Sequence, residues 1–582
     1  MFITTILPAL SDPSNAYNNQ HLYVLESLAT VKSIVLLTDI PSSETLIFNI
    51  FATFFDILSG SSKSSTGEQV AKQVELNMAS ILTIMVDETA ILSPDVIDII
   101  VAQFLRADPR ALNGSTGKHK KNGVLPVVDN KQSTLEIKEL PPAYNLAKTI
   151  CNTCPEKMAR YISQYFNDVI VDASSSSGAK ESSKTRSKRR NSLEDSEDEM
   201  LSGPSEEDLR ELHKVHQLLR ELWRASPAVL QNVIPQLEAE LSAENVQLRL
   251  LATETLGDVI SGIGAAGLQP SPAMDPAAYP PKSIFDSTET AATLNLLTKP
   301  SSPQPFPQTH PQAYSNFLGR RHDKSPVIRS AWTVGIGRIL ATSAGGTGLG
   351  RQEEDRLISD LARMMGDADE KVRLAAVKVI GNFSYRDVIA KLGSSGSLTD
   401  PGSVLATLAE RVRDRKHNVR VEAMTILGRI WGVAAADIVA GNEQVISTIG
   451  AAPAKILDTY YANDMEINAL LDHVVFEQLL SLNYPPSKAK GVKSSSGNTQ
   501  KAKDSQAAGD NEVEGVDADK LWTERMLTLL KSLDDRSKKV FLAIQTRQVV
   551  LSKVMTAFLQ RCGDYNVSYW IRQIGCWLRL IV

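Results

Sequence analysis

The chain has 582 residues, of which 42% are hydrophobic and 22% charged, so it can bury several packed units and is too apolar to be disordered throughout. Its formal net charge of −5 argues against a surface dedicated to nucleic acid, and no uninterrupted run of eighteen apolar residues could span a membrane. Only four cysteines occur, which excludes a disulfide framework and favours a reducing compartment.

Residues 1–171 are predicted to form helical repeats, because helical periodicity dominates and strand alternation is nearly absent. The apolar N-terminus, MFITTILPALSDP, lacks a basic region and a small-residue cleavage pattern, so we interpret it as part of a helix and not as a signal peptide. Cys151 and Cys154 form a C-x-x-C pair without a second ligand pair or a βαβ context. Ordinary helix packing is therefore favoured over a zinc or redox role for these cysteines.

Residues 172–205 are predicted to form a disordered, serine-rich linker in which a basic run precedes an acidic run. The basic run KESSKTRSKRR ends in Lys188, Arg189 and Arg190. It indicates a nuclear localisation patch, the alternative being a merely solvated linker. Ser192 and Ser196 are candidate phosphorylation sites, because phosphate there would add negative charge beside the basic run and could mask it.

Residues 206–483 are predicted to form further helical repeats, interrupted by a Pro-rich insertion over 262–315 that cannot be one continuous helix. His213 and His216 are spaced i,i+3, but no third metal ligand lies close by. Solvent-exposed or hydrogen-bonded histidines are therefore favoured over a metal site.

An internal repeat is the clearest signal in this region. Four segments align on an arginine, with an apolar residue one position before it and a glycine eight positions after it. The arginines are Arg249, Arg329, Arg373 and Arg420, and the glycines are Gly257, Gly337, Gly381 and Gly428. Aspartate stands six positions before the last three arginines, at Asp323, Asp367 and Asp414, whereas the first copy has Ala243 there.

A period in the forties with this pattern resembles the HEAT repeat, in which each unit is a pair of antiparallel helices. We expect the aspartate to lie in the turn and to cap the second helix, and the arginine to pair with an aspartate of its own or of a neighbouring repeat. Loss of Arg373 or Arg420 is predicted to cost about 1–3 kcal/mol by leaving that aspartate unpaired. The glycine is expected to let neighbouring helices approach closely.

Three further motifs in the repeats have functional alternatives. The glycine cluster at 345–350 follows a repeat helix and lacks P-loop spacing, so an inter-helix loop is favoured over a phosphate cradle. The basic stretch 411–420 offers Arg411, Arg413, Arg415 and Lys416 to a phosphate or an acidic partner, although a solvated turn is favoured.

Tyr460 and Tyr461 are adjacent and cannot both face one core stripe. One of them is therefore a candidate exposed anchor for a partner, the alternative being two partly buried rings at a helix end.

The C-terminal part divides by composition. Residues 466–482 are predicted to form an amphipathic helix, 403–413 a helix with Ser403 as its N-cap, and 484–520 a disordered linker. Residues 521–565 are predicted to add HEAT-like helices, with a weaker repeat copy after Asp534, and 566–582 form an atypical tail. No motif for catalysis or for a cofactor occurs, so the chain is interpreted as a protein-binding scaffold and not as an enzyme.

Several stretches together resemble the Pds-five family of cohesin-associated regulators of sister chromatid cohesion, of the fungal type. They include HLYVLESLATVKSIVLLTDI (21–40), NLAKTICNTCPEKMARYISQYFNDVI (145–170), ELHKVHQLLRELWRASPAVLQNVIPQLEAEL (211–241), ILDTYYANDMEINALL (456–471) and WTERMLTLLKSLDDRSKKVF (522–541). The likeness is diffuse, but it is sustained and in order over most of residues 20–560.

The resemblance implies a superhelical HEAT solenoid in the nucleus, bound to chromatin through cohesin. The implied partners are the kleisin subunit, a Wapl-type release factor and the cohesin acetyltransferase, with no membrane and no cofactor. For kleisin contact, the resemblance implies one stretch from Tyr460 through Tyr461 and Asp464 to Glu466, and a second at Lys538 and Lys539.

The chain also departs from the family pattern. The resemblance implies further repeats before Met1 and after Asn566, so the chain is expected to be truncated at both ends and of marginal solubility. The repeats alone leave open a karyopherin-like nuclear transport receptor and, with less support because of the long linkers, a phosphatase scaffold subunit.

Overall fold

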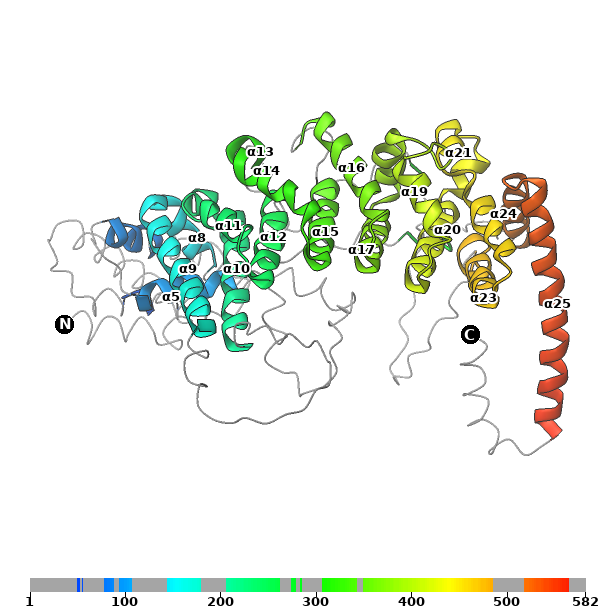
Figure 1. Cartoon of the computed structure of the whole chain (residues 1–582), viewed down its shortest axis with the longest axis horizontal. Helices are drawn as coiled ribbons and strands as arrows, with labels where there is room; N and C mark the ends of the chain where they lie inside the picture. Colours follow the sequence, from blue (N-terminus) through cyan, green and yellow to red (C-terminus); the bar gives the residue numbers. More distant parts are fainter. Residues whose placement is uncertain are drawn as a thin grey trace, which may run out of the picture. The chain divides into compact units, whose positions relative to one another are not determined.

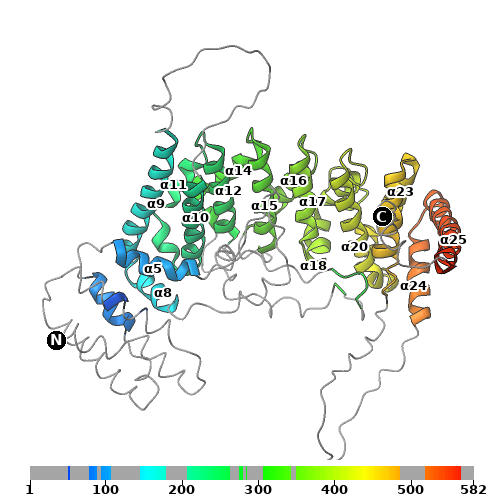
Figure 2. The same cartoon turned by 90° about the horizontal axis from the view of Figure 1, so that it is seen from below.

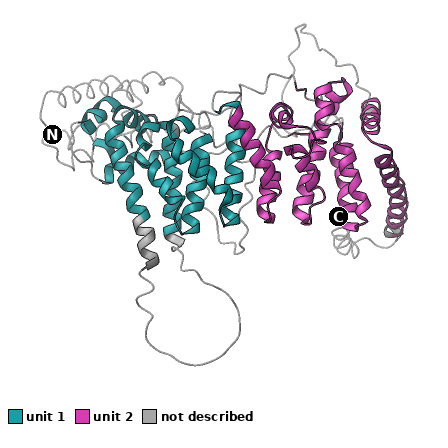
Figure 3. Cartoon of the chain, turned by 45° about the horizontal axis from the view of Figure 1, so that its top comes forward, with its two compact units in different colours: residues 1–270, 293–351 teal, residues 271–292, 352–582 magenta. Residues whose placement is uncertain are grey.

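The computed structural model describes residues 50–52, 55, 78–87, 94–106, 144–178, 206–261, 274–278, 283–284, 306–342, 349–484 and 518–564. All regular elements among these residues are helices (Figure 1), which confirms the all-α, HEAT-like prediction. No helix in the described ranges is long and apolar enough to cross a membrane. The chain divides into two compact units (Figure 3): unit 1 is 1–270 with 293–351, and unit 2 is 271–292 with 352–582.

Unit 1 is built from helices that pack side by side (Figure 1). Its labelled helices are α5 (Pro94–Arg106), α8 (Tyr144–Thr153), α9 (Pro155–Gly178), α10 (Glu206–Ala225), η3 (Pro227–Leu230), α11 (Ile234–Glu240), α12 (Val246–Ser261), α13 (Phe306–Thr309), α14 (Pro311–Gly319), η5 (Arg320–His322) and α15 (Pro326–Thr342).

Unit 2 is also built from helix pairs, in which the second helix of one pair packs on the next pair. Its helices are α16 (Arg351–Met365), α17 (Glu370–Gly381), α18 (Tyr385–Asp387), η6 (Val388–Leu392), η7 (Gly393–Ser395), α19 (Val404–Arg411), α20 (His417–Val439), α21 (Glu443–Ile449), α22 (Ala452–Leu457), η8 (Asp458–Ala462), α23 (Met465–Val474), η9 (Val475–Leu479), α24 (Ala518–Lys531) and α25 (Asp535–Asp564).

The aligned arginine segments coincide with the second helices of successive pairs, α12, α15, α17 and α20. Their repeated apolar positions form the core: Leu256, Ile328, Ile336, Val372, Ile380, Val419 and Leu427 are all almost completely buried. Each such side chain contributes about 1.5–3 kcal/mol when fully buried. The periodic apolar residues therefore join neighbouring pairs into one continuous core within each unit.

The repeated glycines lie where second helices approach one another. A Cβ on Gly257 of α12 would lie 3.1 Å from the Cα of Gly335 on α15, and one on Gly428 of α20 would lie 3.0 Å from Val474 at the end of α23. A Cβ on Gly381 of α17 would lie 2.8 Å from the nearest side-chain carbon of Ile426. The partner of Gly257 is Gly335, two residues before the glycine that the alignment picks out.

Several boundaries differ from the sequence predictions. Helix α9 continues to Gly178, inside the predicted 172–205 linker, and α14 begins at Pro311, inside the predicted insertion. Pro at the first helical position removes only an N–H that would be unbonded there. The predicted 466–482 helix is α23 followed by the π-helical turn η9, whereas Ser403 caps α19 as predicted, accepting a hydrogen bond from the Ala406 N–H at 3.0 Å.

Candidate partner-binding edge of unit 2

The repeated spacing of aspartate and second helix places the carboxylate in a tight turn. Asp367 accepts a hydrogen bond from the Asp369 N–H at 2.8 Å, and Asp414 accepts one from the Lys416 N–H at 2.9 Å. Each donor is the residue just before its helix, so the aspartate forms an Asx turn that leads into the helix. The expected cap on the helix itself is made at α17 by another residue, Asp369, which accepts from the Lys371 N–H.

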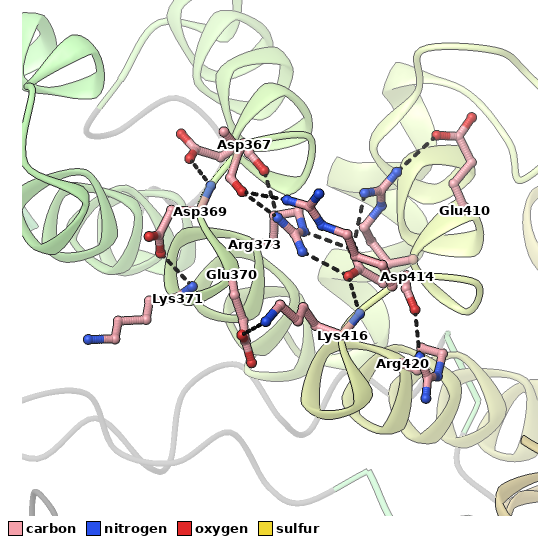
Figure 4. Close-up of polar contacts among 12 residues, drawn as sticks. Asp367, Asp369, Glu370, Lys371, Arg373, Glu410, Asp414, Lys416 and Arg420 are labelled. Carbon is pink, nitrogen blue, oxygen red and sulfur yellow. Dashed lines mark hydrogen bonds and ion pairs between the residues drawn. The ribbon is translucent and has the colours of Figure 1, made fainter. Parts of the chain in front are cut away.

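The arginine at the centre of this region, Arg373, makes two kinds of contact (Figure 4). Its Nη1 donates to the carbonyls of its own turn, to that of Asp367 at 2.9 Å and to that of Ala368 at 3.0 Å. Its remaining N–H groups point to the next repeat, where they hold both carboxylate oxygens of Asp414 at 2.8 Å. Arg373 therefore fixes its own inter-helix turn and clamps the following pair.

The same clamp recurs at the other aligned positions within each unit. In unit 1 the Nε of Arg249 lies 3.3 Å from the carboxylate of Asp323, and in unit 2 the Nη2 of Arg420 lies 2.7 Å from the carboxylate of Glu466. Arg329 donates to the carbonyls of Asp323 and Lys324 in its own turn. We call this series of arginine contacts the repeat ladder.

The pKa shifts of Arg373 and Asp414, the most buried of these pairs, agree with this geometry. Burial alone would raise the pKa of Asp414, but hydrogen bonds from Arg373 and from the Lys416 N–H hold that pKa below its ordinary value. The hydrogen bond to Asp414 raises the pKa of Arg373. Both groups are therefore charged at neutral pH, although Arg373 is 3% and Asp414 6% exposed.

The first stretch predicted for kleisin contact forms an exposed corner between α22 and α23. Tyr460 and Tyr461 lie in η8 with their rings 6.1 Å apart in an edge-on arrangement, and Tyr461 is 46% exposed. The left-handed Asn463 turns the chain, and Asp464 caps α23 by accepting from the Glu466 N–H at 2.8 Å. The Glu466 carboxylate is bound within the unit, by Arg420 and by His417 at 2.8 Å.

The structure brings the second predicted stretch to the same corner. The Tyr461 hydroxyl donates to the Arg536 carbonyl at 3.2 Å, and the Arg536 guanidinium lies 4.1 Å from the centre of the Tyr461 ring. Lys538 and Lys539 follow on the exposed first turn of α25, where Lys538 lies 3.6 Å from Asp535. We call Tyr460, Tyr461, Asp464, Arg536, Lys538 and Lys539 the η8–α25 edge.

Two charged residues of this corner were not identified from the sequence. Arg536 and Asp458 were not predicted as site residues, yet their side chains lie 3.5 Å apart, and Arg413 approaches the other oxygen of Asp458 at 3.9 Å. Arg536 follows the weaker repeat copy at Asp534, whose carboxylate accepts from the Ser537 N–H at 2.8 Å. That repeat turn was the available signal for a charged corner at the start of α25.

The basic stretch 411–420 is largely engaged inside unit 2. Arg411 lies 3.2 Å from Asp414, Arg415 donates to the Ala368 carbonyl at 3.2 Å, and Lys416 lies 3.3 Å from Glu370. These contacts join the turn to the preceding repeat, which agrees with the interpretation as a turn more than with a dedicated anion site.

Among the described residues, the other candidates from the sequence do not come together into a reactive or metal-binding site. Cys151 is completely buried, burial raises the pKa of its thiol to about 12, and both Cys151 and Cys154 are free. Within the described ranges no group of three His, Cys, Asp or Glu side chains could hold a metal ion. Lys188, Arg189, Arg190, Ser192, Ser196 and most of the 345–350 glycine cluster lie outside the described residues.

Of the two candidate histidines, His213 is exposed and His216 is completely buried in a polar network of unit 1. The Nδ1 of His216 lies 3.0 Å from the Thr255 hydroxyl, and its Nε2 lies 3.6 Å from the Glu240 carboxyl. Burial lowers the pKa of His216 well below its ordinary value and raises the pKa of Glu240 to about 8. Both groups are therefore neutral at neutral pH, and their contact is not an ion pair.

Glu240→Gln is expected to remove a pH-dependent loss of stability. Because Glu240 has a raised pKa in the folded protein, it costs stability as the pH rises from about 4.5 to about 8. The variant should match the original protein near pH 4.5 and be more stable by roughly 1–3 kcal/mol at pH 8. Thermal midpoints from helical circular dichroism at both pH values measure this. Glu254→Gln, a more exposed change of the same charge, is the control, and an equal gain there would contradict the assignment.

Comparison with known proteins decides between the possible scaffold classes. The family model described as "Sister chromatid cohesion protein PDS5 protein" matches residues 1–574. The chain belongs to the PDS5 family. This favours the PDS5 family over the transport receptors and phosphatase scaffolds that the repeats alone left open. The match also reaches to residue 574, beyond Asn566, where the resemblance was expected to end.

Individual PDS5 relatives agree along the chain. The sister chromatid cohesion protein pds5 of Schizosaccharomyces pombe is 27% identical over 564 residues, which is 97% of this chain and 35% of that protein. The Saccharomyces cerevisiae PDS5 is 20% identical, over 94% of this chain and 32% of that protein. A solved structure titled as the Pds5–Scc1 complex matches with a TM-score of 0.52 and 20% identity, covering 96% of this chain and 64% of that chain. The chain thus spans about a third of the length of the two yeast relatives.

Proposed function

We propose that the chain is a non-enzymatic, cohesin-associated scaffold that binds the kleisin subunit at the η8–α25 edge. Membership of the PDS5 family supports the role, since those relatives are named as sister chromatid cohesion proteins and one is solved with Scc1. The observation that carries the site is the contact of Tyr461 with Arg536, which unites the two predicted stretches.

The chemistry of this edge suits a protein partner. Tyr461 offers a rigid aromatic ring with a polar tip, and aromatic and arginine side chains are common anchors at interfaces. Lys538 and Lys539 add positive charge beside it, which would steer an acidic segment towards the edge. Glu466, in contrast, is assigned here to the repeat ladder, and its effect on binding would be through the position of α23.

We further propose that the protein acts in the nucleus and reaches chromatin through cohesin. A Wapl-type release factor and the cohesin acetyltransferase are the other proposed partners, in the maintenance and release of cohesion. These parts of the role rest on the family resemblance and not on any contact described above.

Charge reversal at the edge provides the test. Lys538→Glu together with Lys539→Glu is expected to weaken binding of a labelled kleisin fragment at least tenfold, about 1.4 kcal/mol, because the steering charge is inverted. Fluorescence anisotropy over a series of overlapping kleisin fragments measures the affinity. Lys553→Glu, which reverses one exposed charge on the same helix about 21 Å further along, is the control.

Two outcomes would count against the proposal. If no kleisin fragment binds the folded chain, the function is wrong for this part of the protein. If fragments bind but the double variant and Lys553→Glu behave alike, the function stands and the η8–α25 edge is wrong.

A further inference from the structure

Part of the Pro-rich insertion packs on unit 2, although it follows α12 of unit 1 in the chain. Its described residues, 274–278 and 283–284, belong to unit 2. They are drawn as a short green trace close to α20 in Figures 1 and 2. Met274 is only 6% exposed, so this part of the insertion is held against the unit and does not merely pass over it. We call these residues the strap.

The first anchor of the strap is a buried carboxylate. Asp437 of α20 is 5% exposed and accepts three hydrogen bonds. One comes from the Tyr385 hydroxyl at 2.7 Å, and the other two come from the strap, the Ser283 hydroxyl at 3.0 Å and the Ile284 N–H at 3.1 Å. A buried carboxylate needs such donors, because an unsatisfied one is costly in a desolvated site.

The second anchor is a buried guanidinium on α24. Arg525 is 5% exposed and donates to the carbonyls of Leu479 at 3.0 Å and Gly432 at 3.1 Å within the helices, and to that of Pro276 at 2.5 Å in the strap. Burial lowers its pKa to about 10, opposed in part by the negative charge of Asp275, also in the strap. The strap thus adds a carbonyl and an acidic group to the carbonyls that the helices already offer this cation.

Between the anchors, Gly432 of α20 lies close both to the neighbouring helical turn and to the strap. A Cβ on Gly432 would meet the Gln478 carbonyl first, and it would also lie 2.7 Å from the Cβ of Pro276 and 2.9 Å from the Arg525 guanidinium, so glycine leaves room for the helix neighbour and for the strap. A cavity of about 260 Å³ remains beside them, bounded by strap residues and by Gly432, Tyr484 and Arg525. The strap therefore fits a shaped groove but does not fill it to the density of a protein core.

We propose that unit 2 carries a binding groove for an extended, proline-containing peptide, running from Asp437 to Arg525, and that the strap occupies it as a displaceable internal ligand. The recognition elements are those of peptide binding in general: a carboxylate for a hydroxyl and an N–H, a guanidinium for a carbonyl, and a glycine under a proline. Because the strap is tethered, its effective concentration is high, and a competing peptide must overcome it.

The direct test replaces the strap in the chain and adds its sequence as a separate peptide in solution. In a full-length variant, residues 272–286 are replaced by a Gly-Ser segment of equal length, and a labelled peptide of the sequence PAMDPAAYPPKSIFD is added. Saturable binding by anisotropy is expected for the variant, at least tenfold tighter than for the unaltered chain. A peptide with Ser283→Glu should bind at least tenfold more weakly than the unaltered peptide, because its carboxylate would oppose Asp437. A scrambled peptide of the same composition is the control.

Two results would overturn the proposal: no saturable binding to a variant of unchanged helicity, or equal binding to the unaltered chain. Hydrogen exchange in the unaltered protein and in Ser283→Glu provides a measurement that does not need the replacement. The Ile284 amide should exchange at least a hundredfold faster than α20 amides, and faster again in Ser283→Glu with α20 unchanged. Exchange of Ile284 only together with α20 would show that the strap is an integral part of the core.

Discussion

Arg373→Ala is expected to lower the free energy of unfolding of unit 2 by about 3–5 kcal/mol. Arg373 holds Asp414 by two hydrogen bonds of 2.8 Å, and its removal leaves a buried carboxylate without its main partner. The variant also loses the donors to the Asp367 and Ala368 carbonyls, which tie the turn before α17. Urea denaturation followed by circular dichroism and by tryptophan fluorescence, to which the buried Trp431 of unit 2 contributes, would measure the loss.

Arg420→Ala is the matched comparison, because Arg420 occupies the same place one repeat later. Its partner Glu466 has a side chain that is 54% exposed, so water can replace the lost contact, and the expected cost is only about 1–2 kcal/mol. The sequence alone predicts similar losses at the two positions. Equal losses would show that burial of the carboxylate does not decide the strength of the clamp.

Gly257→Leu is expected to destabilise unit 1 by about 3 kcal/mol or more. Even a Cβ at this position would lie 3.1 Å from the backbone of Gly335 and 3.8 Å from the ring of Phe317, and the further carbons of leucine have no space. Helices α12 and α15 would have to separate, which costs packing along their whole contact. Chemical denaturation would measure the change.

Gly319→Leu gives the control for this prediction. Gly319 also lies at a helix in unit 1, but a Cβ there would meet no atom within 4 Å, so the substitution should change stability by less than about 0.5 kcal/mol. If both variants are equally stable, the close approach of α12 and α15 is not required for folding.

Local periodicity was sufficient to predict the repeats, because each HEAT-like pair repeats the same spacing of apolar residues, turn and arginine. Periodicity did not identify a helix pair whose repeat lacks the arginine. Asp464 starts α23 in the same kind of turn, but Leu470 stands where the arginine would be, so this copy was not found. The partner of Arg249 was also not predictable from its own repeat, which has Ala243 at the aspartate position, since the carboxylate comes from Asp323 of the next pair.

The candidate site was predicted only in its separate pieces. Tyr461 and Lys538 could be named from the family resemblance, but the sequence does not say that the Tyr461 hydroxyl reaches the Arg536 carbonyl, 75 residues away. The packing of the strap was even less predictable from the sequence, because Arg525 and Pro276 are 249 residues apart and no periodicity links them. Contacts of this kind depend on how whole elements pack, which composition and spacing do not encode.

The contacts of the repeat ladder do not depend on how many residues lie between consecutive helix pairs. Arg373 meets Asp414 over 41 residues, whereas Arg249 meets Asp323 across the whole Pro-rich insertion, yet both guanidinium groups hold the following turn from the same helical position. The link between pairs takes no part in the clamp. Extra chain can therefore be accommodated there without disturbing the stacking, so this architecture can acquire new linear motifs or tags between repeats while its helical framework stays the same.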